Sequence, residues 1–242
     1  MRMLVVVTVD RPLRLPINYL HILQAIIYRS IGNGNGMSTF FHDEGYRFGK
    51  RPFRLFTFSW LQGKYEIEGK QIVFRNQVRF EVSSPENFLI LKMMESIRRD
   101  GIVFGDNRYE QVEVLVSDET VEEEIITIKM QTPICVYSTM DDGSTYFYTP
   151  EDVEFGEMID RNFKRKYTAY TGLLPNMGVR IEPVHVTAKD KVVTRYQGMM
   201  LSGYRGIYRL SGQRKYLDFL YQAGIGSKNA QGFGMFDLVE EV

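Results

Sequence analysis

The stretch GIGSKNAQGFGMF, Gly224–Phe236, sets four glycines around a short polar insert, after the helical pattern SGQRKYLDFLYQAG and before the strand-like GMFDLVEE. Gly224 fits the usual left-handed stop of a helix. The other glycines allow the polar insert to cradle a phosphate through side chains and exposed N–H groups; a wide turn is the alternative interpretation. The residues expected to take part are Gly224, Gly226, Ser227, Lys228, Asn229, Gly232 and Gly234. Neither a Walker loop nor a dinucleotide-binding fingerprint can be placed here, which argues against nucleotide triphosphate chemistry.

Upstream of this loop, hydrophobic periodicity predicts the same order of elements twice. MLVVVTV predicts a strand buried on both faces that Pro12 and Pro16 break, and 17–31 predicts a helix with an apolar stripe from Leu20 to Ile31. An antiparallel meander, a helix over 83–101 and a strand over 109–117 follow. After the acidic segment DETVEEE, a strand, a long helix, further strands, a second helix and a final strand repeat the order.

Strand, helix, strands, helix, strand is the split βαβ pattern. The sequence therefore predicts an α+β protein of two tandem ferredoxin-like (RRM-like, βαββαβ) domains, 1–118 and 119–242. A single mixed α+β domain is the alternative.

Composition is that of an ordinary globular protein, with 242 residues, 44% hydrophobic and 25% charged. No window approaches eighteen apolar residues, and the N-terminus lacks the length and cleavage site of a signal peptide, so we expect a cytoplasmic protein without a membrane partner. The single cysteine, Cys135, excludes an internal disulfide and is expected to be a small buried hydrophobe.

Charge is unevenly distributed although the net charge is zero. Residues 1–60 hold eight Lys and Arg against three Asp and Glu, and residues 176–215 hold eight against two. Residues 107–160 hold two against fourteen. This pattern predicts a bipolar surface, with basic faces that could bind nucleic acid, if the segments lie on different faces; solvated faces of either sign are the alternative.

A loop of the form G-h-G-x5-G-F-G, at the end of two ferredoxin-like halves, resembles the signature of the RAMP superfamily of CRISPR-associated RNA-binding proteins. The order of AIIYRSI, FFHDEG, FRLFTFS and the terminal loop is similar to that of the Cas family numbered six, the endoribonucleases that cut CRISPR precursor RNA inside each repeat. The resemblance covers essentially the whole chain. It implies CRISPR repeat RNA as the partner, with effector-complex subunits or a second copy of the chain as further possible partners.

The three histidines, His21, His42 and His185, show no metal-ligand spacing, so we predict no metal and no cofactor. RNA supplies its own 2′-hydroxyl as nucleophile if a base removes the proton, an acid protonates the 5′-oxygen and a cation stabilises the phosphorane. The resemblance assigns the family's histidine to His42, and imidazole titrates near neutral pH. An exposed histidine at a helix end is the alternative, and His185 is expected to pack or face solvent.

The resemblance also assigns the family's helix tyrosine to Tyr28, which could position or deprotonate the 2′-hydroxyl; packing is its alternative role. Where the family often has a lysine, this sequence has Arg54, which can stabilise charge on phosphate but cannot serve as an acid. Lys50 and Arg51 could substitute for Arg54. His21 is held in reserve for His42, because it precedes Tyr28 by about two helical turns.

A basic hairpin in the second half is predicted to bind an RNA stem through its phosphates. Its candidate residues are Arg180, Lys191 and Arg195. The cluster Lys164, Arg165 and Lys166 is assigned mainly to helix stability through the helix dipole. Two other functions stay open: a RAMP-type subunit that holds guide RNA without cutting it, and a ferredoxin-like protein with a small-molecule ligand.

Overall fold

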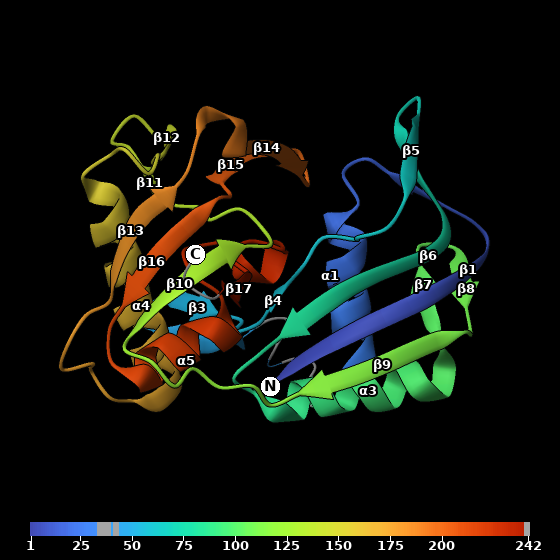
Figure 1. Cartoon of the computed structure of the whole chain (residues 1–242), viewed down its shortest axis with the longest axis horizontal. Coiled ribbons are helices and arrows are strands. Elements are labelled where there is room, and N and C mark those ends of the chain that lie inside the picture. The colour runs from blue at the N-terminus through green and yellow to red at the C-terminus, as the bar shows by residue number, and fades with distance from the viewer. Residues whose placement is uncertain (33–39, 41–43, 240–242) are drawn as a thin grey trace.

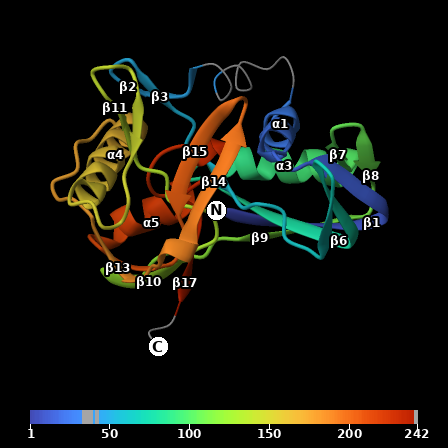
Figure 2. The ribbon, with the colours of Figure 1, turned by 90° about the horizontal axis from the view of Figure 1, so that it is seen from above.

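The computed structural model describes residues 1–32, 40 and 44–239. Two α+β halves lie side by side in Figure 1, the N-terminal half in blue to green and the C-terminal half in yellow to red. In the view from above, the helices α1 and α3 lie on one side of the N-terminal sheet (Figure 2). Within the described residues, no helix combines the length and apolar character that a membrane crossing needs.

The N-terminal half has a five-stranded antiparallel sheet in which β4, β6, β1 and β9 are neighbours in that order and β5 also pairs with β6. Its strands and helices are β1 (Arg2–Pro16), α1 (Leu20–Ser30), β4 (Thr57–Phe58), β5 (Tyr65–Glu68), β6 (Gln71–Ser83), α3 (Asn87–Asp100) and β9 (Val112–Ser117).

The C-terminal half has a four-stranded antiparallel sheet with the order β13, β16, β10, β17. Its elements are β10 (Ile125–Met130), α4 (Glu154–Thr171), β13 (Arg180–His185), β16 (Ile207–Ser211), α5 (Arg214–Ala223) and β17 (Phe236–Val239). If the main strands of each half are numbered along the chain, both sheets have the order second, third, first, fourth. The predicted tandem ferredoxin-like fold is therefore confirmed.

Among the residues that the structure describes, four small hairpins accompany the two sheets. The hairpin of β14 and β15 lies between the halves in Figure 2. The four hairpins consist of β2 (Tyr46–Phe48) with β3 (Arg51–Phe53), β7 (Ile102–Phe104) with β8 (Asn107–Tyr109), β11 (Tyr137–Thr139) with β12 (Thr145–Phe147), and β14 (Lys191–Tyr196) with β15 (Met199–Tyr204). The 3₁₀ helices η2 (Ala188–Asp190) and η3 (Asn229–Gln231) also lie in the described part of the chain.

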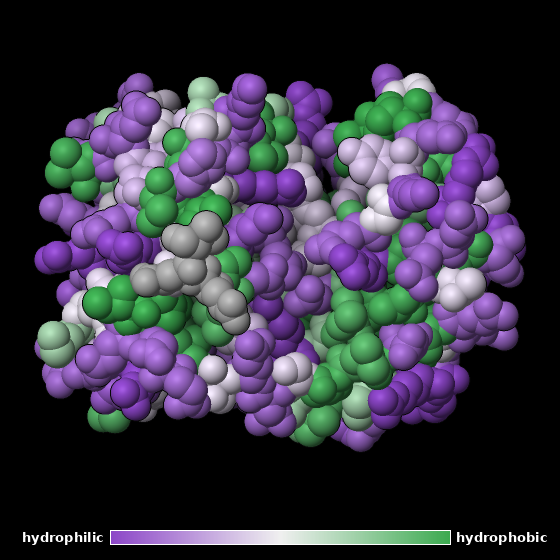
Figure 3. All heavy atoms as spheres, viewed as in Figure 1, coloured by the Kyte–Doolittle hydropathy of each residue, from purple (hydrophilic) through white to green (hydrophobic). Residues whose placement is uncertain are grey.

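Two expectations for the first strand are wrong. Pro12 does not end β1, which continues to Pro16 after a register shift between Val9 and Leu13. Proline is tolerated at such an irregularity because the ladder is already interrupted there. The strand is also not buried on both faces: the helices cover one face only, and on the other Leu4 is half-buried beside Leu115, which is 53% exposed. Figure 3, viewed as Figure 1, shows hydrophobic side chains gathered on the face of the N-terminal sheet that the helices do not cover.

Each half contributes side chains to the core of the other. Phe53 and Leu55 pack in the core of the C-terminal half, whereas Cys135, Tyr196 and Phe233 pack in that of the N-terminal half. Cys135 is fully buried, as predicted, and burial raises the pKa of its thiol to about 12. We propose that the domain boundary lies at 118/119, in the connection between β9 and β10, although the packing of the halves is continuous.

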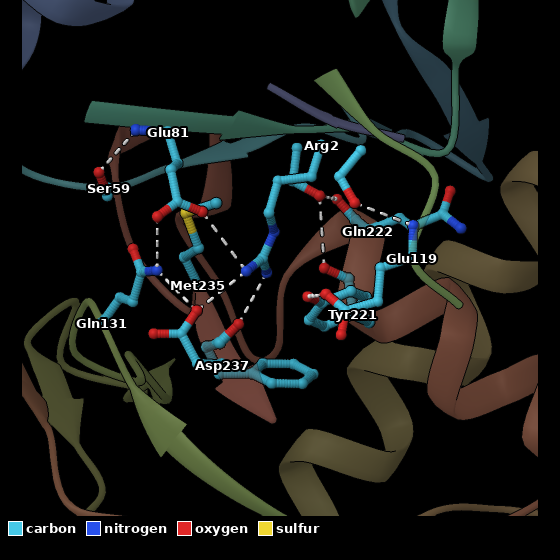
Figure 4. A network of polar contacts seen from close by, with 12 residues as sticks. Arg2, Ser59, Glu81, Glu119, Gln131, Tyr221, Gln222, Met235 and Asp237 are labelled. Carbon is cyan, nitrogen blue, oxygen red and sulfur yellow. Dashed lines mark hydrogen bonds and ion pairs between the residues drawn. The ribbon is translucent and has the colours of Figure 1, made fainter. Parts of the chain in front are cut away.

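Arg2 joins the two halves through a network of polar contacts (Figure 4). Its guanidinium, on β1, donates to Asp237 Oδ1 at 3.0 Å and to the carbonyl oxygen of Phe236 at 2.7 Å, and it lies 3.5 Å from Glu81. The same group stacks 4.1 Å from the ring centroid of Tyr221 on α5. One side chain therefore holds β1 and β6 of the first half to β17 and α5 of the second.

Candidate functional site

The glycine loop, residues 224–234, connects α5 to β17. Its four glycines are buried and have φ between 70° and 85°, which explains why other residues are disfavoured there. A Cβ on Gly234 would lie 1.9 Å from the carbonyl oxygen of Ile225, and one on Gly232 would lie 2.8 Å from the ring of Phe58. The glycines therefore permit close packing of the loop on itself and on the N-terminal half.

Three side chains of the N-terminal half bind carbonyl oxygens of the glycine loop. Thr57 Oγ1 donates to Phe233 at 2.9 Å, and Trp60 Nε1 donates to Gly232 at 2.8 Å. Gln24 Nε2, on α1, donates to Ala230 at 2.5 Å. The loop is thus fixed to the half that carries Tyr28.

From the C-terminal half, Lys166 binds the inner side of the glycine loop. Its Nζ donates to the carbonyl oxygens of Gly224 at 2.5 Å and Gly226 at 3.3 Å, and to Asn229 Oδ1 at 3.1 Å. The Asn229 amide donates in turn to the carbonyls of Ile225 and Phe233, both at 3.0 Å. The side chain of Asn229 therefore points into the loop and organises it.

A cleft of about 440 Å³ opens between the two halves beside this loop. Tyr28, Arg51 and Arg54 line it from the N-terminal half, and residues 226–231 line it from the glycine loop. Lys166 and Lys228 bring the cationic lining residues to four. Among the lining residues that the structure describes there is no carboxylate, so this opening suits a phosphate.

Tyr28 is half-buried, and its ring lies 5.6 Å from that of Phe56 in an edge-to-face arrangement. The hydroxyl of Tyr196, from the β14–β15 hairpin, donates to Gln24 Oε1, one turn before Tyr28 on α1. Burial and the neighbouring Tyr28 raise the pKa of Tyr196 to about 12. The hairpin is thereby connected to the helix that carries the candidate tyrosine.

The structure brings some predicted site residues together and leaves others apart. Tyr28, Arg51, Arg54 and the glycine loop share the cleft, whereas His42 lies outside the described residues. His21 is exposed on α1, where its Nδ1 lies 2.9 Å from the carbonyl oxygen of Asn18. Lys50 is exposed just before β3. Neither residue lines the cleft.

The predicted basic hairpin is divided between two sheets. Lys191 and Arg195 are exposed on β14, at alternate positions that share one face. Arg180 lies instead on β13 of the four-stranded sheet, where it lines a different depression together with Glu157 and Asp160. His185 is exposed at the end of β13.

Sequence reasoning missed the two polar side chains of α4 that reach the glycine loop. Lys166 is 2% exposed, so it is not a solvated helix-end charge, and Asn162 donates to Ser227 Oγ at 3.4 Å. Burial, reinforced by Arg51, lowers the pKa of Lys166 to about 7. A signal was present: Asn162 and Lys166 continue the buried stripe that begins with Phe155, and polar residues on such a stripe need partners.

Two ferredoxin-like halves that together enclose a glycine loop and a cationic cleft define a tandem ferredoxin-like protein with a phosphate-compatible site. Residues 116–238 match the family described as CRISPR associated protein Cas6, C-terminal, and the chain belongs to the Cas6 family.

Two curated relatives extend the likeness to nearly the whole chain. The CRISPR-associated endoribonuclease Cas6 1 of Methanocaldococcus jannaschii is 25% identical, over 94% of this chain and 88% of its own. The CRISPR-associated endoribonuclease Cas6 of Pyrococcus furiosus is 26% identical, over 93% of this chain and 84% of its own. The fold is similar to the solved structure of a Cas6-related gene product from Pyrococcus furiosus, with a TM-score of 0.82, 21% identity and coverage of 100% and 99% of the two chains.

Proposed function

We propose that this protein is an endoribonuclease that cuts CRISPR precursor RNA within the repeats without a metal ion. The names of the two curated relatives support the class of activity. The observation that carries the proposal is the cleft, in which Tyr28, Arg51 and Arg54 face the glycine loop across an opening lined by four cationic side chains. Such a lining attracts the RNA backbone and stabilises charge that develops at phosphorus.

In the proposed reaction the 2′-oxygen of the RNA attacks the adjacent phosphorus, and the bond from phosphorus to the 5′-oxygen breaks. The 2′-hydroxyl proton leaves to a base and the 5′-oxygen receives a proton, which gives a 2′,3′-cyclic phosphate and a 5′-hydroxyl. Tyr28 orients or deprotonates the 2′-hydroxyl, and His42 transfers a proton. Arg54, with Arg51 beside it in the cleft, stabilises the phosphorane by charge and hydrogen bonds.

The position of Gly45 supports the assignment of His42 to this cleft. Gly45, three residues later, is buried, and a Cβ there would lie 3.1 Å from Cδ of Arg54 and 2.6 Å from the carbonyl oxygen of Phe53. Gly45 N–H also donates to the carbonyl of Phe40 at 2.6 Å. The chain after His42 thus packs against a residue that lines the cleft.

The chemistry is tested with repeat RNA in single-turnover reactions. Cutting is expected to persist in EDTA and to stop when the nucleotide just upstream of the cut carries a 2′-deoxy sugar. Loss of cutting in EDTA would exclude metal independence, and cutting of the deoxy substrate would exclude attack by the 2′-oxygen. End analysis should find the cyclic phosphate.

Replacing His42 tests the proton transfer. His42→Ala is expected to slow cleavage by about 10²- to 10⁴-fold, the usual contribution of a general acid or base, with little change in RNA affinity. His185→Ala is the matched control and should leave the rate unchanged. Wild-type cleavage by His42→Ala together with slow cleavage by His21→Ala would transfer the role to His21.

We further propose that the exposed cations of β14 bind the RNA backbone. For single-stranded RNA, each phosphate contact contributes about 0.7 to the slope of log affinity against log salt concentration. The double variant Lys191→Met/Arg195→Met should lower that slope by about 1.4. Arg180→Met, on the other sheet, should lower it less; an equal loss would place the RNA across both sheets.

A non-cutting guide-RNA subunit is the second candidate, and tight binding of repeat RNA without any single-turnover product would favour it. Absence of RNA affinity even at low salt would favour a small-molecule ligand instead. Association with effector-complex subunits or with a second copy of the chain stays a prediction, which sedimentation with and without RNA would test.

A further inference from the structure

Lys166 is held by an unusual set of partners for a buried cation. All three of its hydrogen-bond acceptors are uncharged oxygens of the glycine loop, two backbone carbonyls and the Asn229 amide. An ammonium group has three donors, so these contacts satisfy it completely. A buried ammonium is expensive unless it is fully hydrogen-bonded, and the fold supplies this only while the loop keeps its shape.

The partners of Lys166 lie at the start and in the middle of the glycine loop. Gly224 and Gly226 come at the start, where α5 ends, and Asn229 begins η3. Asn229 carries the contact onward, because its amide binds Ile225 and Phe233 across the loop. Removing the ammonium would therefore release several connected contacts.

We propose that Lys166 is a positioning residue for RNA cleavage: its ammonium fixes the glycine loop in the conformation that presents residues 226–231 to the cleft opposite Tyr28 and Arg54. This inference rests on the proposed function. The side chain acts through the loop and does not touch RNA, since it is 2% exposed and all three donors are occupied.

The test compares Lys166→Met with two matched lysine variants. Methionine keeps the unbranched stem and removes the three donors. Lys164→Met, on the same helix, removes a partly exposed lysine that pairs with Asp160 at 2.6 Å, outside the cleft lining. Lys228→Met removes the loop lysine, whose Nζ lies 5.1 Å from the ring centroid of Tyr137 and which lines the cleft itself.

Lys166→Met is expected to slow single-turnover cleavage of repeat RNA by about 10- to 100-fold, because misplacing a contact surface by about 1 Å has effects of this size. The salt dependence of its RNA affinity should match wild type, since no phosphate contact is lost. Lys228→Met should instead lower the salt slope by about 0.7, and Lys164→Met should resemble wild type in both measurements.

Hydrogen exchange supplies a readout that needs no RNA. The N–H groups of Ile225 and Ser227 bind the carbonyls of Gly234 and Cys135 at 2.8 Å, and peptides covering residues 224–234 should exchange faster in Lys166→Met but not in Lys164→Met. Unchanged exchange and an unchanged cleavage rate would overturn the proposal. A salt slope lowered as in Lys228→Met would overturn it too, because Lys166 would then contact phosphate directly.

Asn229→Ala supplies the test if Lys166→Met does not fold, since it removes the same contact from the loop side. Where both variants fold, their effects on the cleavage rate should not add, and additive effects would contradict a shared route through the loop. Failure of wild type to cut repeat RNA would defeat the proposed function instead, and hydrogen exchange would still decide whether Lys166 orders the loop.

Discussion

Arg2 and Lys166 are both buried cations at junctions in the fold. Arg2 joins the two halves and Lys166 joins α4 to the glycine loop, and their partners differ in charge. Arg2, 9% exposed, lies between the carboxylates of Asp237 and Glu81 and also binds a carbonyl. Lys166, 2% exposed, binds uncharged oxygens and lines the cleft. Two carboxylates neutralise the charge of Arg2, which joins two sheets. The acceptors of Lys166 are uncharged, so they do not neutralise the charge that Lys166 carries below its pKa of about 7.

This difference determines what each junction tolerates. Without Arg2, two partly buried carboxylates would face each other with no cation between them, which opposes folding. Without Lys166, neutral oxygens would lose a donor but no charge would be left unpaired. Of the two side chains, Arg2 should therefore matter more for stability, and Lys166 should matter more for the shape of the loop.

The largest loss of stability is expected from a substitution that disrupts the backbone conformation of the glycine loop, to which Lys166 binds. Gly234→Ala should lower the free energy of unfolding by about 3 to 5 kcal/mol, because φ is +77° and the new Cβ would lie 1.9 Å from a backbone oxygen. Gly105→Ala, with φ of +61° and open space around it, is the control and should cost about 1 kcal/mol. Urea unfolding measures both; equal losses would mean that close packing is irrelevant at Gly234.

Removing the cation of the other junction should have the next largest effect. Arg2→Met is expected to cost about 2 to 3 kcal/mol of unfolding free energy, below the usual penalty for a broken buried pair because Asp237 is partly exposed. RNA cleavage by the folded variant should be close to wild type. Arg14→Met, which removes an exposed ion pair of the same strand, is the control. Stability equal to wild type in Arg2→Met would contradict a structural role for the network.

The sequence predicted the fold because both halves obey local periodicity. The apolar stripe from Leu20 to Ile31 and the order of strands and helices could be predicted without knowing the contacts between the halves. Tyr28 and Arg54 are two of the three leading catalytic candidates, and in the structure they line one cleft together with the glycine loop.

Both buried cations escaped prediction because their partners are distant in the chain. Arg2 is followed by an apolar strand and meets Asp237 after 235 residues, a distance that no local pattern encodes. Lys166 belongs to the run FKRKY, in which three adjacent cations resemble a solvated helix end. The stripe of α4 distinguishes Lys166 from its neighbours, but the acceptors lie about 60 residues later.

The pH dependence of stability sharpens the comparison, because lysine can lose its charge near neutrality and arginine cannot. The pKa of Lys166 is about 7 in the folded protein and ordinarily 10.5, so between these values the unfolded chain holds a proton that the folded protein has lost. Stability should therefore rise with pH from about 7, by up to about 1.4 kcal/mol per pH unit, and be insensitive to this group below that pH.

Lys166→Met isolates this contribution. The unfolding free energy of wild type minus that of the variant should increase between about pH 7 and pH 9.5. The N-terminal amine, whose pKa burial lowers from 8.0, titrates in the same range but is present in both proteins and cancels. The nearby charge of Arg51 also lowers the pKa of Lys166. Arg51 is present in both wild type and Lys166→Met, so the two proteins differ only at residue 166. A difference that does not vary with pH would mean that Lys166 keeps its proton throughout.

The smallest effect is expected at a third junction, which carries no charge. Tyr196 binds Gln24 through its hydroxyl, so Tyr196→Phe removes one neutral hydrogen bond and should cost about 1 kcal/mol of unfolding free energy. Because no ion is involved, this loss should be the same at low and high salt, whereas the loss in Arg2→Met should shrink as salt screens the pairs. Tyr146→Phe, at an exposed tyrosine, is the control. A loss in Tyr196→Phe that shrank in high salt would show that nearby charges contribute to this junction as they do at Arg2, and the distinction between the junctions would fail.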